Sequence, residues 1–218
     1  QRVALSRALV FEPRLVLMDE PLGALDKNLR EQMQYEIKHI HDRIGITVVY
    51  VTHDQSEALT MSNRIAVFND GIVQQLSTPD ILYEKPENSF VAQFIGENNR
   101  MTGTIKSMDN NYCSVELDKG AGNVKALKIN VGDVGEKTQL SVRPERVSVN
   151  QDSTYENKFS GVVKELIYLG DHIRARLNVC GNEEFIVKIP NEGNIDLQEG
   201  SEINVSWDPK DIRALDYI

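Results

Sequence analysis

The spacing of hydrophobic residues changes near Gly96, and this change divides the chain into two parts. Before Gly96, short apolar runs alternate with stretches whose apolar residues recur every three or four positions, which is typical of strands alternating with helices. After Gly96 the helical period is absent, and short alternating runs are separated by Gly, Asp and Asn. We therefore expect an α/β part at residues 1–96 and an all-β part at residues 97–218, at the strand spacing of a small barrel or sandwich.

Two apolar runs in the first part predict neighbouring strands of a parallel sheet. Residues 15–18 and 47–52 are nearly continuous in hydrophobic character, so we expect each strand to be buried on both faces. An amphipathic helix is predicted between them, because apolar residues form one stripe at positions 29, 33, 37, 40 and 44. Asp26 is suited to cap its start, and Gly45 is suited to follow its last turn.

Shorter elements are predicted after the second strand. Residues 64–73 predict a hairpin, because Asn69, Asp70 and Gly71 supply the residue types that tolerate the positive φ of a tight turn. Residues 78–83 and 89–95 predict two helices separated by Pro86.

Polar residues follow both predicted strands at what we expect to be the same edge of the sheet. Asp19 and Glu20 follow the first strand, and His53 follows the second. The carboxyl ends of parallel strands are where α/β proteins bind ligands. An Asp there can hold Mg²⁺, a Glu can polarise water for attack on a phosphate, and a His can contact a terminal phosphate.

Each of these residues also has a plain structural interpretation. Asp19 and Glu20 could form an exposed turn with Pro21, His53 could cap or pack at a strand end, and Asp26 could be an N-cap and nothing more. The ordered set is harder to explain structurally than any single member. The sequence therefore favours a phosphate-processing site at this edge.

The ordered set resembles the ATP-binding cassette (ABC) ATPases. Gln1–Leu9 resembles the helix that follows their LSGGQ signature, and Leu15–Glu20 resembles their Walker B strand. Gly23–Asp26 is similar to their D-loop, and Val51–Asp54 is similar to their switch-histidine loop. The D-loop of the family more often begins with Ser, so Gly23 is a departure that we expect to matter little.

This resemblance implies the cofactors ATP and Mg²⁺ and roles for four residues. Asp19 would bind Mg²⁺, Glu20 would be the general base, and His53 would contact the γ-phosphate. Asp26 would take part in the nucleotide site and communicate across a dimer. The fold implied is the C-terminal part of a P-loop NTPase domain of the ABC type.

The phosphate-binding motif of such ATPases does not occur in the sequence. No G-x-x-x-x-G-K-S/T is present, and the signature sequence and the Gln-loop are also missing. The backbone amides and the Lys of that motif hold the β- and γ-phosphates. We therefore expect the chain to be the C-terminal portion of an ABC ATPase, and we predict that residues 1–218 alone do not hydrolyse ATP.

The second part contains an internal repeat. Met101–Lys106 resembles Phe159–Lys164, and Ser141–Val147 resembles Ser206–Ile212, in the same order. Duplication of a small barrel is the favoured explanation, and chance similarity between two β segments is the alternative. With Arg143-Pro144-Glu145 inside the repeat, this part resembles the OB-like TOBE domain of importer ATPases in the MalK/PotA-like group.

The resemblance implies an energy-coupling ATPase of an ABC importer. Its partners would be a second ATPase subunit in a homodimer, integral membrane permease subunits and, indirectly, a periplasmic substrate-binding protein. Its place would be peripheral, on the cytoplasmic side of the inner membrane. Residues 55–65 and 207–215 are most similar to importers of spermidine and putrescine, while sugar and ferric iron importers stay open. A ligand-sensing or dimerisation module is the alternative of a different class.

Composition narrows these alternatives. With 24 Lys and Arg against 33 Asp and Glu, the formal net charge is −9, which disfavours broad binding of nucleic acid and so a soluble ABC ATPase of DNA repair or translation. Cys113 and Cys180 lie far apart without a nearby Cys/His cluster, which fits neither a disulfide scaffold nor a zinc site. The apolar runs are shorter than the roughly 18 to 20 residues of a membrane span.

Overall fold

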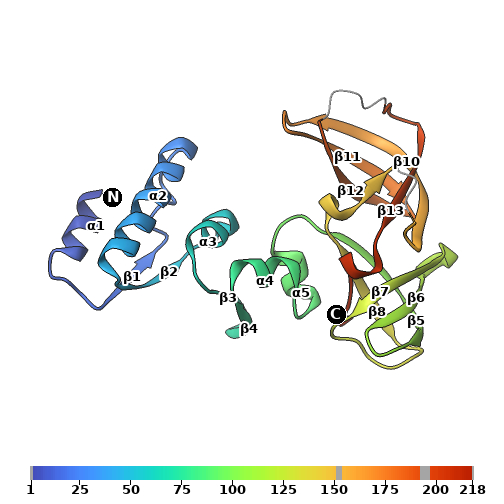
Figure 1. The fold of residues 1–218 in the computed structure, drawn as a ribbon, viewed down its shortest axis with the longest axis horizontal. Helices are drawn as coiled ribbons and strands as arrows, with labels where there is room; N and C mark the ends of the chain where they lie inside the picture. The colour runs from blue at the N-terminus through green and yellow to red at the C-terminus, as the bar shows by residue number, and fades with distance from the viewer. Residues whose placement is uncertain (1, 151–153, 192–196, 218) are drawn as a thin grey trace. The chain divides into compact units, whose positions relative to one another are not determined.

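The structure is a computed structural model that describes all residues except 1, 151–153, 192–196 and 218 (Figure 1). It contains two compact units, residues 1–85 and 86–218, and each is described by itself. Within the residues described, the first unit is α/β and the second is all-β apart from one α-helix and short 3₁₀ turns, so the predicted fold class is confirmed. No helix within the described ranges is both long enough and apolar enough to cross a bilayer.

The elements of the first unit, in chain order, are α1 (Arg2–Leu9), β1 (Leu15–Asp19), α2 (Lys27–Ile44), β2 (Thr47–Val51), α3 (Gln55–Met61), β3 (Ile65–Asn69), β4 (Ile72–Ser77) and α4 (Pro79–Glu84). Those of the second unit are α5 (Ser89–Phe94), β5 (Asn99–Met108), β6 (Tyr112–Leu117), η1 (Asp118–Gly120), β7 (Asn123–Lys128), β8 (Lys137–Val142), η2 (Pro144–Arg146), β9 (Ser148–Val149), β10 (Asn157–Tyr168), β11 (His172–Val179), β12 (Asn182–Pro190), β13 (Glu202–Trp207), η3 (Pro209–Asp211) and β14 (Ile212–Leu215).

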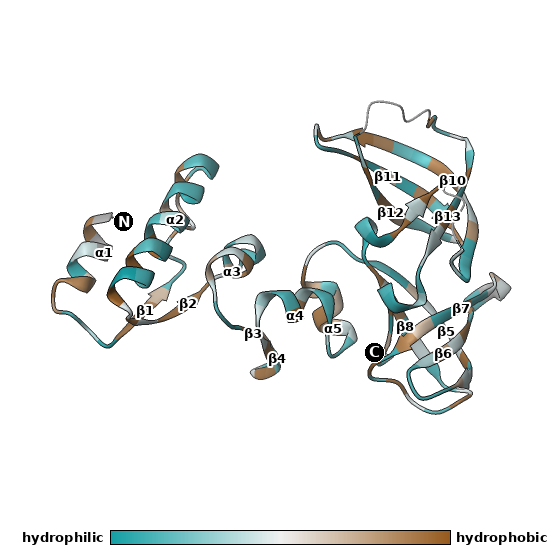
Figure 2. Cartoon of the chain, in the orientation of Figure 1, coloured by the Kyte–Doolittle hydropathy of each residue, from teal (hydrophilic) through white to brown (hydrophobic). Residues whose placement is uncertain are grey.

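The strands β1 and β2 form a parallel pair with α2 on one of its faces. Val16 and Met18 on β1 are buried with residues of α2 and with Ile46. The opposite face is open, and Leu17 is 72% exposed. The expectation that both strands are buried on both faces is therefore wrong for this chain, although Figure 2 shows how hydrophobic β2 is. An apolar run indicates that both faces of a strand are hydrophobic, but it does not show what covers them. Among the residues that the structure describes, α2 covers one face of this pair and the other face is open.

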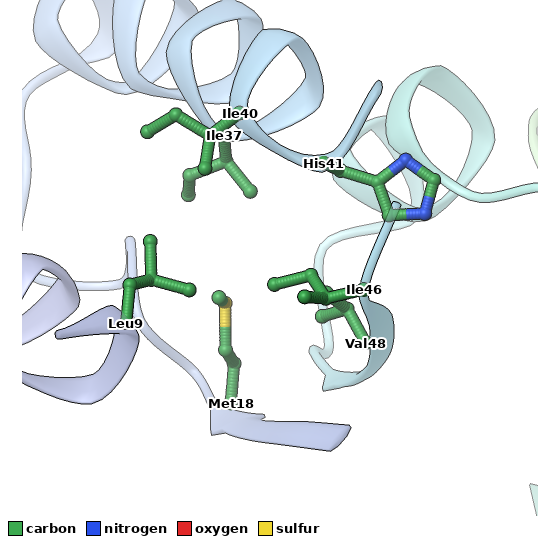
Figure 3. Close-up of a pocket in the computed structure, with 7 residues that line it drawn as sticks. All are labelled: Leu9, Met18, Ile37, Ile40, His41, Ile46 and Val48. Atoms are coloured by element: carbon green, nitrogen blue, oxygen red, sulfur yellow. The ribbon is translucent and has the colours of Figure 1, made fainter. Parts of the chain in front are cut away.

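The helix α2 begins and ends as its sequence predicts. Asp26 precedes it as the N-cap, and its Oδ1 accepts a hydrogen bond of 3.0 Å from the amide of Leu29. Gly45 follows it with φ of 71°, in the left-handed region that glycine adopts without strain. An apolar pocket lies beside this helix (Figure 3), lined by Leu9, Met18, Ile37, Ile40, His41, Ile46 and Val48.

The predicted hairpin is also present. The strands β3 and β4 pair in antiparallel fashion, and Asp70 and Gly71 turn the chain with φ of 49° and 75°.

The short helix α5 is part of the second unit, where Nη1 of Arg143 donates hydrogen bonds to the carbonyl oxygens of Ala92 and Ile95. The compact units thus divide between Lys85 and Pro86, whereas the periodicity of the sequence changes near residue 96. The domain boundary at 96/97 stays a prediction.

The second unit consists of two five-stranded sheets with equivalent strand orders. The first is a closed barrel with the order β14-β7-β6-β5-β8, and the second has the order β12-β11-β10-β13-β9. The first pair of repeated segments lies on β5 and β10, and the second pair begins on the last residues of β8 and β13 and continues through η2 and η3. The strands of each pair hold equivalent positions in the two sheets. Both β5 and β10 also have an irregular register at the same point, before Ser107 and before Glu165.

Glycine is required at equivalent positions of the two copies. A Cβ atom on Gly103 would lie 2.4 Å from the carbonyl oxygen of Glu116, and one on Gly161 would lie 2.8 Å from Cγ2 of Val179. Each glycine lets a neighbouring strand approach closely. The two copies therefore share a packing requirement as well as a sequence pattern.

The two copies exchange their last strands. The strand β9 follows the first copy but pairs with β13 of the second, and β14 follows the second copy but pairs with β7 and β8 of the first. The first barrel is closed only by β14. Each copy therefore completes the sheet of the other.

Two buried asparagines link the copies reciprocally. The amide of Asn99, on β5, accepts from the backbone N–H of Ile186 and donates to its carbonyl oxygen, both at 2.7 Å. The amide of Asn157, on β10, makes the same pair of hydrogen bonds with the backbone of Lys125, both at 2.9 Å. The two side chains are 1% and 2% exposed. Each side chain thus satisfies one backbone N–H and one backbone C=O group of the other copy.

We predict that Asn157→Ala destabilises the second unit by about 1–3 kcal/mol, because the N–H and C=O of Lys125 are left unpaired. Urea denaturation followed by the fluorescence of Trp207, the one tryptophan of the chain, measures this loss. Asn110→Ala, at an exposed loop position, is the matched control and is expected to change stability by less than about 0.5 kcal/mol. Equal midpoints for the two variants would show that Asn157 has no such role.

Candidate functional site

The carboxyl ends of β1 and β2 bring Glu20 and His53 together. Asp19, the last residue of β1, lies opposite Val51, the last residue of β2, so the two strands end at the same level. The amide of Glu20 donates to the carbonyl oxygen of Val51 at 2.9 Å, which continues the ladder by one residue. Nδ1 of His53 lies 2.9 Å from Oε1 of Glu20. The structure thus joins two of the four predicted site residues directly.

The backbone of Glu20 is unusual. Its φ of 43° is in the left-handed region, which residues with a side chain seldom adopt. Such strain persists where the surrounding structure holds it, and it is concentrated at functional sites. Here it turns the chain sharply from β1 into Pro21 and presents the carboxylate at the edge of the sheet.

Gly23, the departure from the family pattern, makes little steric difference. A Cβ atom at this position would lie 3.7 Å from the carbonyl oxygen of Glu20 and 3.8 Å from its Oε2, which is ordinary contact. A serine would fit the same backbone. The turn from Gly23 to Asp26 therefore does not depend on glycine.

The carboxylate of Glu20 raises the pKa of His53, first through their hydrogen bond and second through its charge. Both side chains are largely exposed, so the pair is open to a ligand. A raised pKa favours the imidazolium form, in which both ring nitrogens donate hydrogen bonds. With Nδ1 turned to Glu20, the second N–H of His53 is left to meet an anion.

We predict that Glu20→Gln lowers the pKa of His53 toward the ordinary histidine value of about 6.5, because the neutral amide no longer stabilises the imidazolium. An NMR titration of the four histidines of the chain measures this change. His172 in the second unit, whose Nδ1 lies 2.8 Å from Oδ1 of Asp171, is the internal reference for the titration. An unchanged or higher pKa of His53 would contradict the pairing.

Asp54 anchors the loop that carries His53. Its Oδ1 accepts hydrogen bonds from the amides of Ser56 and Glu57 and from the hydroxyl of Ser56, and so caps α3. The amide of Asp54 in turn donates to Oγ1 of Thr52 at 2.9 Å. The hydrogen bond from the hydroxyl of Ser56 is the largest of the interactions that lower the pKa of Asp54. Sequence reasoning placed Asp54 in this loop but missed its capping role, which the Asp-x-x-Glu spacing signals.

Asp26 is placed differently from the other three residues. It caps α2 through the amide of Leu29, and this hydrogen bond is local to its own helix. Its predicted role across a dimer therefore stays a prediction.

Asp19 fits the requirements for one ligand of Mg²⁺. It is exposed at the end of β1, and Mg²⁺ is commonly held by one or two carboxylates together with phosphate oxygens and water. No group of three or more His, Cys, Asp or Glu side chains suited to a metal exists within the residues that the structure describes. Asp19 is thus the candidate ligand at this edge, and the sequence contains no G-x-x-x-x-G-K-S/T motif to hold the phosphates of ATP.

An α/β unit with these strand ends, followed by a duplicated small barrel, is the arrangement expected from the resemblance to ABC-type ATPases with a TOBE domain. The TOBE domain family matches residues 140–215. The chain is 39% identical over 222 residues to the spermidine/putrescine import ATP-binding protein PotA of Trichodesmium erythraeum, covering 99% of this chain and 58% of that protein.

Two further relatives carry the same name. PotA of Pseudomonas aeruginosa strain UCBPP-PA14 is 45% identical over 194 residues, covering 88% of this chain and 53% of that protein. PotA of Chromobacterium violaceum is 47% identical over 174 residues, covering 78% of this chain and 48% of that protein. The chain thus spans about half the length of the curated relatives that it matches. Its homology with PotA-type import ATP-binding proteins extends along nearly its whole length.

Among solved structures, the molybdate-binding protein ModG aligns with 53% of this chain and 94% of its own, at 18% identity and a TM-score of 0.45. This likeness is too distant to add to the assignment.

Proposed function

We propose that the full-length protein is the ATP-hydrolysing, energy-coupling subunit of an ABC importer for polyamines of the spermidine and putrescine type. The observation that carries the proposal is the separation of 2.9 Å between Oε1 of Glu20 and Nδ1 of His53, at the strand edge where Asp19 ends β1. The printed names of the homologous proteins support the cargo.

Each residue at this edge has a distinct role in the proposed mechanism. Asp19 would supply one carboxylate ligand to Mg²⁺, which on binding neutralises charge on the transferring phosphoryl group. Glu20 would orient the attacking water and accept its proton. His53 would donate one hydrogen bond from its Nδ1–H to Glu20 and another from its Nε2–H to the terminal phosphate.

The proposed partners follow from the same family. Two copies of the subunit would dimerise, with Asp26 near the interface, and would act on integral membrane permease subunits. A periplasmic binding protein would deliver the polyamine to these permease subunits. The subunit would lie peripherally on the cytoplasmic side of the membrane. The acidic net charge of −9 supports protein partners over nucleic acid.

The proposal is tested by reconstituting the full-length protein with its permease and binding protein in proteoliposomes. We expect ATP hydrolysis to increase when the binding protein is loaded with spermidine or putrescine, and labelled polyamine to cross the membrane. Maltose and ferric iron are the comparison cargoes. Stimulation by either of these, with polyamines inert, would contradict the polyamine assignment and leave the importer class intact.

A further inference from the structure

Arg30 reaches acceptors on two separate loops from the first turns of α2. Its Nη2 donates to the carbonyl oxygen of Leu25 at 3.1 Å, and its Nη1 donates to Oδ2 of Asp54 at 3.0 Å. Leu25 belongs to the turn that precedes α2, and Asp54 directly follows His53. Arg30 therefore ties the D-loop-like turn to the loop that carries His53.

A buried carboxylate forms the third part of this network. Glu57 is 2% exposed, and its Oε1 lies 3.7 Å from Nε of Arg30, which is buried without a hydrogen bond. Its Oε2 accepts hydrogen bonds from the hydroxyl of Tyr50 at 2.7 Å and from that of Thr52 at 2.9 Å. A buried charge is costly unless it is paired and hydrogen-bonded, so Arg30 compensates Glu57. The network thus holds the chain before His53 as well as after it.

The position of His53 depends on these neighbours. Its side chain is 77% exposed, so packing does little to fix it. Thr52 before it is bonded to Glu57, and Asp54 after it is bonded to Arg30 and to the start of α3. The backbone on both sides of His53 is therefore fixed through groups that converge on Arg30.

We propose that Arg30 is a positioning residue for His53: through Asp54, Glu57 and the carbonyl oxygen of Leu25, it holds the loop so that His53 meets Glu20. This inference rests on the proposed ATP hydrolysis. Arginine suits the task because its planar group offers five donors in a fixed fork, whereas lysine is a compact charge that cannot serve three separated acceptors in the same way.

The test compares ATP hydrolysis and thermal melting of the full-length protein and four variants. Arg30→Gln removes the network, and Arg30→Lys keeps only the charge. The double variant Arg30→Gln with Glu57→Gln removes the buried carboxylate together with its cationic partner, so the fold is not penalised by an uncompensated carboxylate. Arg43→Gln is the matched control, because Arg43 is an exposed residue of the same helix.

We expect kcat to fall at least about fivefold in all three Arg30 variants, since small misplacements of a catalytic group cost one to two orders of magnitude, while KM for ATP stays within about twofold. The double variant is expected to melt close to the wild type and still turn over slowly. Recovery of kcat to within about fivefold of wild type in the double variant would show that Arg30 only compensates the charge of Glu57, and would overturn the proposal. An Arg30→Gln variant that behaves like Arg43→Gln, or that changes KM alone, would also overturn it. A wild-type protein without ATP hydrolysis would contradict the proposed function, and this inference with it.

Discussion

Glu20→Gln in the full-length protein is expected to lower ATP turnover by at least about a hundredfold, which is the lower end of what a general base contributes. Glutamine has the shape of glutamate and can still contact His53, but it cannot accept a proton from water. The loss should therefore fall on kcat, with nucleotide binding retained. Release of phosphate under saturating Mg²⁺ and ATP measures the effect.

The matched control for this variant is Glu31→Gln. Glu31 is an exposed residue of α2, and its replacement has the same chemistry without touching the edge of the sheet. We expect it to keep wild-type turnover. Undiminished turnover in Glu20→Gln would remove Glu20 from the mechanism, whatever the geometry of its contact with His53.

Truncation after Asp211 is expected to prevent the second unit from folding, because it removes β14. Ile212, Ala214 and Leu215 are fully buried, and β14 closes the first barrel between β7 and β8. Burial of the Ile and Leu side chains alone contributes about 1.5–3 kcal/mol each, and the lost ladder adds to this. The total is comparable with the 5–15 kcal/mol by which whole domains are stable.

The fluorescence of Trp207 reports this loss, since Trp207 is buried and its ring stacks on those of Phe159 and Phe185. We expect no cooperative unfolding transition in the truncated protein. Truncation after Asp216 is the matched control, because it keeps β14 and the hydrogen bond from the amide of Ser89 to Asp216. A cooperative transition near that of the control would show that β14 is dispensable.

Sequence patterns predicted those parts of the fold that depend on local rules. Asp26 and Gly45 mark the ends of α2 because capping needs only a few neighbouring residues. The exchange of β9 and β14 could not be predicted, because similarity between repeats shows which segments are alike and not which copy each one pairs with. The open face of β1 was missed for a related reason: hydrophobic residues such as Leu17 require a covering layer, but do not reveal whether this chain provides it.

The candidate site divides in the same way. Asp19, Glu20 and His53 could be placed at one edge because parallel strands end together. Arg30 gave no signal, since an arginine on an amphipathic helix is ordinarily a solvated residue, and its partner Asp54 lies 24 positions away. The sequence likewise indicates only that Glu57 lies in the first turn of a helix. Its burial and its hydrogen bond from Tyr50 depend on tertiary packing, which the local sequence does not show.

The most direct test of this account is Mg²⁺-dependent ATP hydrolysis, measured side by side for the full-length protein and for residues 1–218. The account predicts turnover by the full-length protein and none by residues 1–218, because these residues supply Asp19, Glu20 and His53 but no glycine-rich loop to hold the phosphates. Robust hydrolysis by residues 1–218, or none by the full-length protein, would contradict it.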